Sequence, residues 1–171
     1  MANPPAMHSP LPLRTRLLLM LPVSLVVLLV DQLTKAWAVS HLAGHPPRTY
    51  LGILTLTYAE NLGAWGSLGA GWTPTLRFAA LTAFPMLLLV GVGIHILRDR
   101  LATRTDLLAL ALVIGGGAGN LIDRLQLGHV RDFLYLGYGP IGTNIFNIAD
   151  SMVMLALPLL LFGRRPEPSD G

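Results

Sequence analysis

The sequence contains no cysteine and few charged residues. Of its 171 residues, 12 are Lys or Arg and 9 are Asp or Glu. Charged residues therefore make up 12% of the chain, against about 25% in ordinary soluble domains. The missing thiols exclude disulfide bonds, a thiolate nucleophile and a cysteine-based metal site. The low charge and a mean hydropathy of +0.59 favour one compact membrane domain.

Two further residue types are scarce, because Lys35 is the only lysine and only two glutamates occur. His41 and His45 are four residues apart, but the sequence has no HExxH motif, so we expect no metal ion. A Ser/Lys peptidase is not favoured, since no spacing singles out one serine as a partner for Lys35. The arginines do not form one continuous patch, so we expect no nucleic-acid partner.

Four apolar stretches are candidates for membrane helices, since a bilayer core needs about 20 largely apolar residues. They comprise residues 17–37, 76–97, 106–122 and 144–162. For the first stretch, a cleavable signal peptide is the alternative, because Ala38 and Ser40 form a small-x-small site. Asp31 and Lys35 inside its final part argue against that alternative.

The charge distribution predicts the orientation and the ends of the chain. Seven of the arginines fall on one side of the four stretches, and four arginines and the lysine fall on the other. By the positive-inside rule, the richer side is the cytoplasm, which places both termini there. We expect a Pro-rich disordered leader over residues 1–13, an integral-membrane domain over 14–163 and a polar cytoplasmic tail over 164–171.

The external segment, residues 38–75, is too apolar to be a simple linker. Residues 54–58 alternate with period two, which predicts a short strand, paired with residues 50–53. Trp37, Trp65 and Trp72 all lie in or beside this segment. Tryptophan is enriched at membrane–water interfaces, so we expect the segment to rest on the lipid surface.

Four aspartates lie in or beside apolar stretches: Asp31, Asp123, Asp132 and Asp150. A carboxylate inside a membrane costs a few kcal/mol and usually has a function. Asp150 lies six residues into the fourth stretch, and Asn147 precedes it by three, on the same face of a helix. Asp132 lies in the link between the third and fourth stretches, which brings it toward the outer end of the fourth. We therefore expect Asp132 and Asp150 to meet near the outer face of the membrane.

Two carboxyls in a site of low dielectric constant share one proton, so one can act as a base and the other as an acid. Such a pair can activate a water molecule against a peptide bond without a metal or a cofactor. Simpler interpretations remain: Asp132 as an exposed loop residue, Asp150 in an ion pair with Arg124 or Lys35, and Asp31 neutralised by Lys35. A small transporter or proton relay, or a scaffold in which aspartates join helices, are the alternative functions.

Five motifs together resemble those of lipoprotein signal peptidase, the bacterial signal peptidase II family. They are Asp31 to Lys35 (DQLTK), Asn61 to Ala64 (NLGA), Gly115 to Arg124 (GGGAGNLIDR), Val130 to Phe133 (VRDF) and Phe146 to Ser151 (FNIADS). The resemblance implies four transmembrane helices, a small extracytoplasmic β-sheet, and an interfacial half-helix between the first two spans. It also implies an aspartyl endopeptidase of the bacterial cytoplasmic (inner) membrane, with its active site near the outer face.

The family removes signal peptides from prolipoproteins by cutting before a cysteine that carries diacylglycerol, and globomycin inhibits it. Lipid and the diacylglyceryl-prolipoprotein are therefore the implied partners, and no cofactor is implied. By position, Asp132 and Asp150 match the catalytic pair. The resemblance gives substrate-binding or supporting roles to Asp31, Lys35, Asn61, Gly63, Asn120, Asp123, Arg124 and Asn147.

One departure from the family pattern concerns the second motif. The family commonly continues Asn-x-Gly-Ala with a further alanine and then Phe or Trp, whereas here Trp65 follows Ala64 directly. We therefore expect an altered loop shape at this point and an unchanged catalytic pair.

Overall fold

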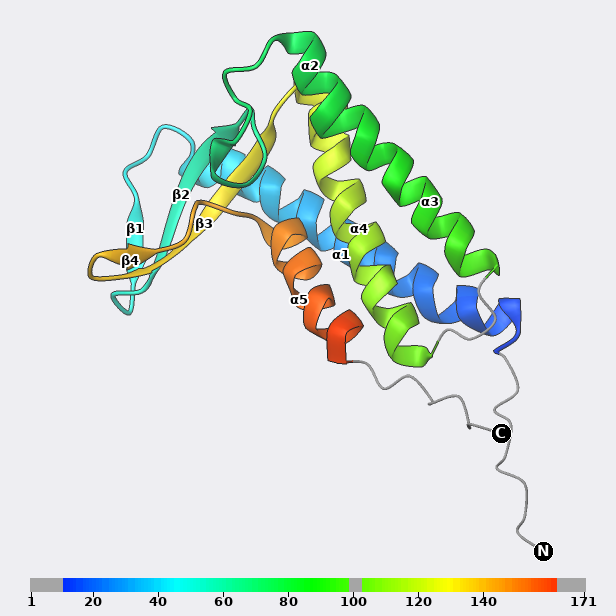
Figure 1. Ribbon diagram of the computed structural model, residues 1–171. Helices are drawn as coiled ribbons and strands as arrows, with labels where there is room; N and C mark the ends of the chain where they lie inside the picture. Colours follow the sequence, from blue (N-terminus) through cyan, green and yellow to red (C-terminus); the bar gives the residue numbers. More distant parts are fainter. Residues whose placement is uncertain (1–10, 99–102, 163–171) are drawn as a thin grey trace, which may run out of the picture.

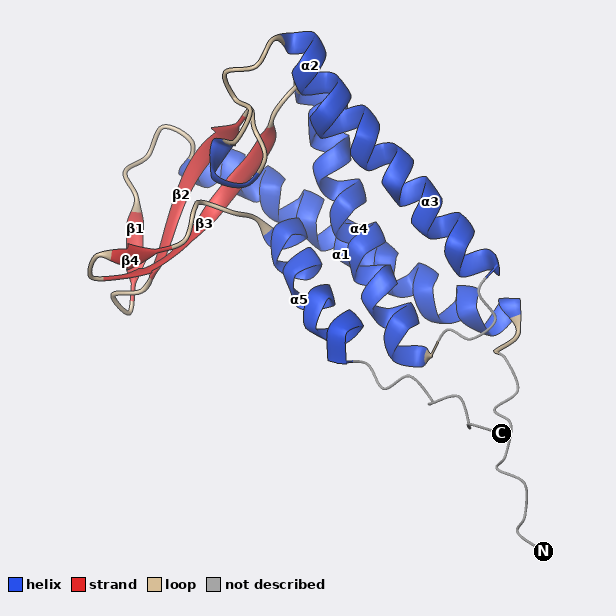
Figure 2. Ribbon diagram, viewed as in Figure 1, coloured by secondary structure: helices blue, strands red, loops and turns tan. Residues whose placement is uncertain are grey.

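The computed structural model describes residues 11–98 and 103–162. Its helices are α1 (Leu13–Leu42), η1 (Trp65–Ser67), α2 (Pro74–Phe78), η2 (Ala79–Ala83), α3 (Phe84–Arg98), α4 (Arg104–Leu127) and α5 (Ile148–Phe162). Its strands are β1 (Arg48–Tyr50), β2 (Leu54–Asn61), β3 (Val130–Tyr138) and β4 (Ile141–Gly142). The helices form an elongated bundle with the sheet at one end (Figures 1 and 2). Most of the expected leader and all of the expected tail lie outside the described residues.

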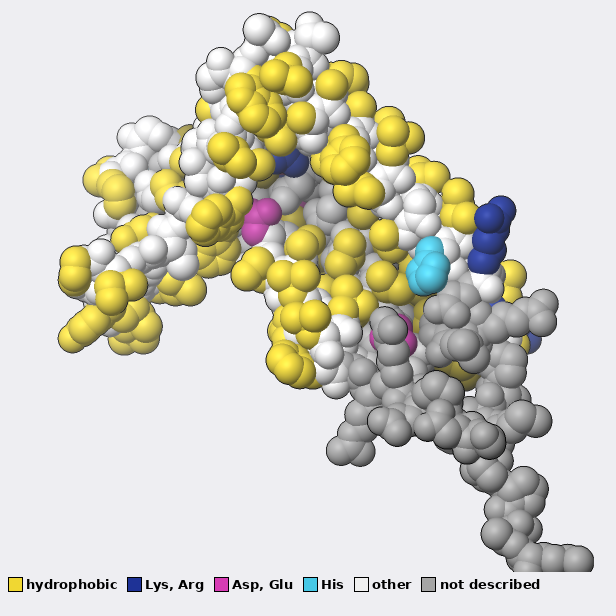
Figure 3. Space-filling model, in the orientation of Figure 1, with side chains coloured by type: hydrophobic (Ala, Val, Ile, Leu, Met, Phe, Trp, Pro, Cys, Tyr) yellow, Lys and Arg dark blue, Asp and Glu magenta, His cyan; other side chains and the backbone are white. Residues whose placement is uncertain are grey.

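Three helical segments of the described residues are long and apolar enough to cross a membrane. They are α1, the segment from Pro74 to Ile96 that joins α2, η2 and α3, and α4. The helix α5 is equally apolar in character but has 15 residues. Large hydrophobic side chains are exposed along the bundle, as Figure 3 shows, which is the surface expected of helices in lipid.

The helix α4 is the centre of the bundle and packs against α1, α3 and α5. It begins with a capping box between Thr103 and Asp106 and ends at Gly128, whose φ of 76° is left-handed. Gly116 allows a close approach to α5, because a Cβ there would lie 2.6 Å from the carbonyl oxygen of Ala149. The glycine-rich part of α4 therefore lets the helices that carry the polar residues pack backbone to backbone.

The second apolar helix accommodates its proline through a wider helical turn. The helix from Pro74 to Arg98 contains a π-helical turn, η2, immediately before Pro85. Because proline lacks an N–H and its ring crowds the carbonyl four residues earlier, a wider turn relieves the clash at Leu81.

The sheet is antiparallel, with the order β1-β2-β3-β4. Its hydrophobic face packs on the end of α1, where Ala38, Leu42 and Phe133 form a buried cluster. The strand β2 contains a bulge, because two of its residues lie opposite Phe133 alone, between the pairs Leu56–Leu134 and Ala59–Asp132. Bulges re-aim neighbouring side chains, and this one lies directly beside Asp132.

Two sequence-based boundaries are wrong, and one strand was not predicted. Residues 51–53 form the turn of the first hairpin, and the strand paired with β2 is residues 48–50 instead. The link before the fourth apolar stretch contains β3, the longest strand, which the sequence analysis missed. The fourth helix begins at Ile148 and not at Asn144, because Phe146 forms a β-bridge with Leu134. The interfacial half-helix stays a prediction, since the helical turn between β2 and α2 is the three-residue η1.

Candidate active site

Asp132 and Asp150 come together because β3 holds the segment that precedes α5. Backbone hydrogen bonds of 2.8 and 2.9 Å join Leu134 and Phe146 in both directions. The next residue, Asn147, then lies opposite Asp132, and its Nδ2 donates to Asp132 Oδ1 at 2.7 Å. Asp132 is 2% exposed, so the alternative of an exposed loop carboxylate is wrong.

Asn147 and Asp150 form a reciprocal cap at the start of α5. The backbone N–H of Asp150 donates to Asn147 Oδ1 at 2.9 Å, and the backbone N–H of Asn147 donates to Asp150 Oδ2 at 3.3 Å. This is the geometry of a capping box, and a carboxylate in the first helical turn is favoured by the helix dipole. Asn147 therefore precedes the helix, and it does not lie within it as the sequence analysis supposed.

Two more asparagines complete the surroundings of the carboxylates. Asn120 Nδ2 donates to Asp150 Oδ1 at 2.7 Å, and Asn61 Nδ2 donates to Asp132 Oδ2 at 3.0 Å. Asn147 Nδ2 also donates to Asn120 Oδ1 at 3.1 Å. A continuous chain of hydrogen bonds through two amides thus connects the two carboxylates, which come from a strand and a helix 18 residues apart.

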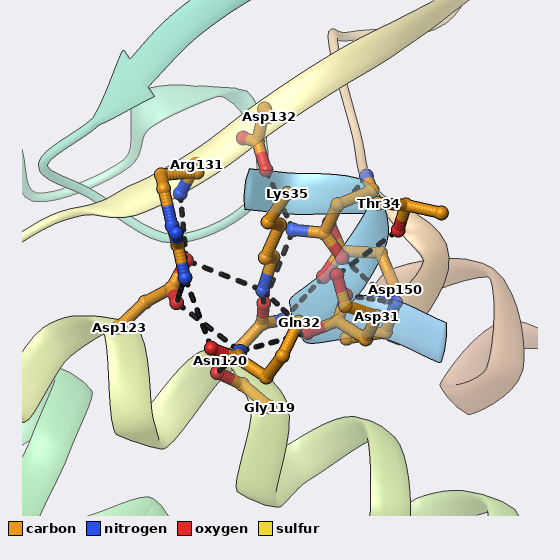
Figure 4. A network of polar contacts seen from close by, with 12 residues as sticks. Asp31, Gln32, Thr34, Lys35, Gly119, Asn120, Asp123, Arg131, Asp132 and Asp150 are labelled. Carbon is orange, nitrogen blue, oxygen red and sulfur yellow. Dashed lines mark hydrogen bonds and ion pairs between the residues drawn. The ribbon is translucent and has the colours of Figure 1, made fainter. Parts of the chain in front are cut away.

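Beside this group lies a buried cluster of opposite charges (Figure 4). Lys35 is fully buried and lies 2.9 Å from Asp31 Oδ2 and 3.3 Å from Asp123 Oδ2. Its third donor reaches Asn120 Oδ1 at 2.8 Å. An ammonium has three N–H groups, so all of the hydrogen-bonding capacity of Lys35 is used. The pairing of Lys35 with Asp31 that the sequence suggested is confirmed. It is one of three contacts that the Lys35 ammonium makes.

Arg131 and Gln32 extend the cluster on the side of Asp123. Arg131 Nη2 lies 2.6 Å from Asp123 Oδ1, and its Nε lies 3.2 Å from Asp123 Oδ2. Gln32 donates to Asp31 and Asp123, and its Oε1 accepts from Arg131. Two cations thus balance two carboxylates, as buried charges require. The hydrogen bonds that Arg131 donates to Asp123 raise the pKa of its guanidinium.

Asp31 links this charge cluster to the start of α5. Its Oδ1 accepts the backbone N–H of Ala149 at 2.9 Å. The first N–H groups of a helix lack partners within the helix, so Asp31 satisfies one of them from α1. The position of Asp150 on α5 therefore depends on α1 as well as on β3 and α4.

Burial determines the acidity of Asp132. Loss of hydration, and to a smaller extent the negative charge of Asp150, raise its pKa, which is about 6. The hydrogen bonds from Asn61 and Asn147, and the charge of Lys35, oppose this rise. A carboxyl with a pKa of about 6 can both hold and release a proton near neutral pH.

A cavity of about 450 Å³ opens beside Asp150. Its polar wall contains Asn61, Asn120 and Arg124, and Arg124 Nη2 donates to the carbonyl oxygen of Gly63 at 3.1 Å. Gly63 has to be a glycine, because a Cβ there would lie 2.5 Å from the backbone of residues 67 and 68. The rest of the wall is mostly apolar or loop backbone and consists of Ala64, Trp65, Gly66, Val130, Thr143, Asn144, Ile145, Phe146, Ser151, Val153 and Met154.

The ten site residues proposed from the sequence lie in three groups. Asp132, Asp150, Asn61, Asn120 and Asn147 form one hydrogen-bonded group. The charge cluster contains Asp31, Lys35 and Asp123, and the cavity wall contains Arg124 with Gly63 bonded to it. Gln32 and Arg131 were not predicted as site residues, although each directly adjoins a proposed aspartate.

The alternative interpretation, an ion pair of Asp150 with Arg124 or Lys35, is not among the ion pairs of the described residues. The Asp150 carboxylate instead accepts from the side-chain amide of Asn120 and the backbone N–H of Asn147. Within residues 11–98 and 103–162, no group of three His, Asp or Glu side chains is arranged to hold a metal ion.

Comparison with known proteins adds independent findings. Residues 23–163 match the family model described as signal peptidase (SPase) II. The chain is 38% identical over 148 residues to a lipoprotein signal peptidase of Streptococcus pyogenes, with 81% of this chain and 88% of the relative covered. It is 36% identical over 187 residues to that of Mycolicibacterium smegmatis, with coverages of 96% and 75%. A solved bacterial membrane enzyme superposes with a TM-score of 0.71 at 25% identity, covering 92% of this chain and 91% of the other. The chain therefore belongs to the signal peptidase II family.

Proposed function

We propose that the chain is an aspartyl endopeptidase that removes the signal peptide from diacylglyceryl-modified prolipoproteins, cutting before the lipidated cysteine. Its relatives are named lipoprotein signal peptidases. The observation that carries the aspartyl mechanism is the connection of Asp132 to Asp150 through the amides of Asn147 and Asn120. Two neighbouring carboxyls can share one proton, which supplies both the base and the acid that an aspartyl mechanism uses.

In the first step, the ionised carboxylate takes a proton from a water molecule while the water oxygen attacks the scissile carbonyl carbon. The protonated carboxyl of the other aspartate gives its proton to the carbonyl oxygen, which yields a neutral gem-diol. In the second step, the first aspartate gives its new proton to the amide nitrogen, and the second takes a proton from one gem-diol hydroxyl. The C–N bond breaks, and the pair again holds a single proton.

The composition of the cavity supports a substrate that is part peptide and part lipid. On one side, Asn61, Asn120 and Arg124 offer donors and acceptors for a peptide backbone. On the other side, Phe146, Val153 and Met154 offer apolar surface. A substrate that carries acyl chains beside its scissile bond needs both kinds of wall, and hydrocarbon contacts contribute about 25 cal/mol per Å² buried.

We propose that α1, the helix from Pro74 to Arg98, α4 and α5 all span the cytoplasmic membrane of a bacterium. The sheet and the proposed catalytic pair would then face the outer side, and both termini the cytoplasm. Arg14, Arg16 and Arg104 lie at the opposite end of the bundle from β3, which supports this orientation by the positive-inside rule. The helix α5 has 15 residues, which is short for a membrane span. The loop before α5 holds the first turn of this helix at the level of the proposed catalytic pair.

The proposal is tested by Asp132→Asn and Asp150→Asn, assayed on a diacylglyceryl-modified precursor in detergent. Each variant should fold, insert and lose at least about 10³-fold in turnover, because an amide cannot act as acid or base. Asp106→Asn is the matched control, since Asp106 caps α4 far from the site, and it should keep its activity. Normal turnover in either of the first two variants contradicts the proposed pair. Inhibition by globomycin is the expected companion result.

The acidic residues also bear on the transporter alternative. Asp31, Asp123 and Asp150 cluster beside Asp132 at one end of the bundle, and α3 contains no acidic residue. A proton pathway needs titratable groups through the depth of the membrane, so this distribution favours the peptidase. Proton flux into liposomes containing the protein, lost in Asp150→Asn, is the result that the transporter requires.

A further inference from the structure

The far end of the sheet exposes six large hydrophobic side chains. It consists of residues 50–53, the last residue of β1 and the turn that follows it, and residues 136–141, the end of β3, the next turn and the first residue of β4; we call these two neighbouring segments the sheet tip. The exposed side chains are Tyr50, Leu51, Ile53, Leu136, Tyr138 and Ile141. Figure 3 shows this end of the molecule as a hydrophobic projection. An exposed apolar patch of this kind marks an interaction surface.

The sheet tip also lacks charge. No charged residue occurs between Arg48 and Glu60, or between Asp132 and Asp150. Of the charges on the sheet, Glu60, Arg131 and Asp132 lie at its other end, and Arg48 lies at the start of β1, two residues from Tyr50. An exposed hairpin in water normally carries lysines or other charges that prevent association. The only polar groups among the six large side chains are the hydroxyls of Tyr50 and Tyr138, and tyrosine is enriched at the level of lipid headgroups.

Leu51 is held in an unfavourable backbone conformation at the tip. Its φ is +52°, that of the following Gly52 is +71°, and Leu51 is 95% exposed. Hairpin turns with positive φ at two successive residues strongly prefer Asn or Asp before Gly, because a leucine Cβ is crowded there. In water, a large hydrophobic residue at this position is unfavourable for two reasons: its backbone conformation is strained, and its side chain is exposed to solvent. Burial of its side chain in hydrocarbon would offset both.

The position of the tip identifies what can cover it. The sheet projects sideways from one end of the helical bundle, so the sheet tip lies beyond the helices. The tip stays level with the ends of α1 and α4 that carry the site (Figure 1). The lipid-facing surfaces of the helices end at the same level. Lipid of the outer leaflet therefore lies beside the tip once the helices span the membrane as proposed above, and this inference depends on that placement.

We infer that the sheet tip inserts into the outer leaflet at the boundary between headgroups and acyl chains. The tip then anchors the far end of β3, the strand that carries Asp132, while Asn147 holds its near end against α5. Anchoring both ends fixes the depth of Asp132 relative to the bilayer. A substrate confined to the bilayer by its acyl chains meets the catalytic pair at a constant depth.

The absence of cysteine allows a direct measurement of insertion. A nitroxide on Leu51→Cys, in proteoliposomes of phosphatidylethanolamine and phosphatidylglycerol, should collide more often with oxygen than with a water-soluble nickel chelate. A nitroxide on Glu60→Cys, at the other end of the first hairpin, is the matched control and should show the reverse order. Equal access of the chelate to both labels overturns the inference. Spin–spin broadening at residue 51 shows a second copy on the tip and overturns it as well.

A second variant separates insertion from folding. Leu51→Asn suits a positive φ and removes the hydrophobic side chain, so its unfolding temperature in detergent should be equal to that of the parent or higher. In liposomes, the KM for the lipidated precursor should rise about tenfold for Leu51→Asn combined with Ile141→Asn, with kcat unchanged. An unchanged KM contradicts the anchoring role. The collision measurement requires no turnover, so it remains decisive if the proposed activity is wrong.

Discussion

Lys35 determines which way the amide of Asn120 faces. The ammonium donates to Asn120 Oδ1 at 2.8 Å, and Asn120 Nδ2 donates to Asp150 Oδ1 at 2.7 Å. Because an ammonium has only donors, the amide oxygen has to face Lys35 and the amide nitrogen has to face Asp150. A residue outside the cavity lining thereby keeps a hydrogen-bond donor directed at a proposed catalytic carboxylate.

Replacement of Lys35 should separate this positioning role from charge balance. Lys35→Met leaves Asp31 and Asp123 with one fewer cation, and it should destabilise the protein by about 3–5 kcal/mol. Adding Asp31→Asn restores the charge balance, so the double variant should recover part of that loss in thermal unfolding. Turnover of the double variant should stay at least about tenfold low, the effect of about 1.4 kcal/mol on the barrier. Full turnover in a folded double variant contradicts the positioning role.

The acidity of Asp132 should respond to its neighbours in opposite directions. Asn61→Ala removes a donor that stabilises the carboxylate, so the pKa of Asp132 should rise above about 6. Asp150→Asn removes a nearby negative charge, so the pKa should fall toward 3.8. Infrared titration of the carboxyl C=O band, with Asp132→Asn to assign it, measures both shifts. Shifts of the same sign in both variants would rule out this account.

The same pKa has a consequence for stability. The carboxyl of Asp132 titrates at about 6 in the folded protein and at 3.8 as a free group. Between these values the folded state holds a proton that the unfolded state has released, so this group makes unfolding easier as pH rises through that window. In Asp132→Asn, unfolding in detergent should lose that part of its pH dependence between about pH 4 and 6.

We expect replacement of Asp123 to lower the stability of the protein more than its turnover. Asp123 is fully buried and lies within ion-pair distance of Lys35 and Arg131, so its carboxylate is occupied by cations. Asp123→Asn should lower the free energy of unfolding by about 3–5 kcal/mol, since it leaves a buried cation underneutralised. The protein that remains folded should keep most of its turnover per molecule, measured against the amount that elutes as a single species. Complete loss of turnover at normal stability would instead assign Asp123 to the chemistry.

Much of the site follows from the sequence because its members are polar residues where a membrane protein tolerates few. Asp132, Asp150 and the pairing of Asp31 with Lys35 could be identified on that ground, and their proximity could be inferred from the short link before α5. Arg131 could not, because an arginine on the outer side also counts as an ordinary topology signal. Its bond to Asp123 depends on how β3 is placed against α4.

The errors have a common cause in contacts between distant parts of the chain. The strand β3 pairs with β2, about 75 residues earlier, and no local pattern specifies that register. Spacing of three residues between Asn147 and Asp150 fits both a shared helical face and a capping box. The reciprocal hydrogen bonds between Asn147 and Asp150 decide for the capping box, and the bridge from Phe146 to Leu134 places the preceding residue in the sheet.

The close packing of α4 against α5 can be tested with a pair of glycine substitutions. At Gly116, a Cβ would lie 2.6 Å from the carbonyl oxygen of Ala149 and 3.1 Å from the side chain of Val153. Gly116→Ala should push α5 away from α4, destabilise the protein by about 1–3 kcal/mol and move Asp150 from Asn120.

The control is Gly93→Ala on α3, where a Cβ meets no atom within 4 Å. Alanine favours a helix by about 1 kcal/mol over glycine, so this variant should be equally stable or more stable, with unchanged turnover. Thermal unfolding and turnover in the same detergent measure both effects. If the two variants behave alike, backbone contact between α4 and α5 does not position Asp150.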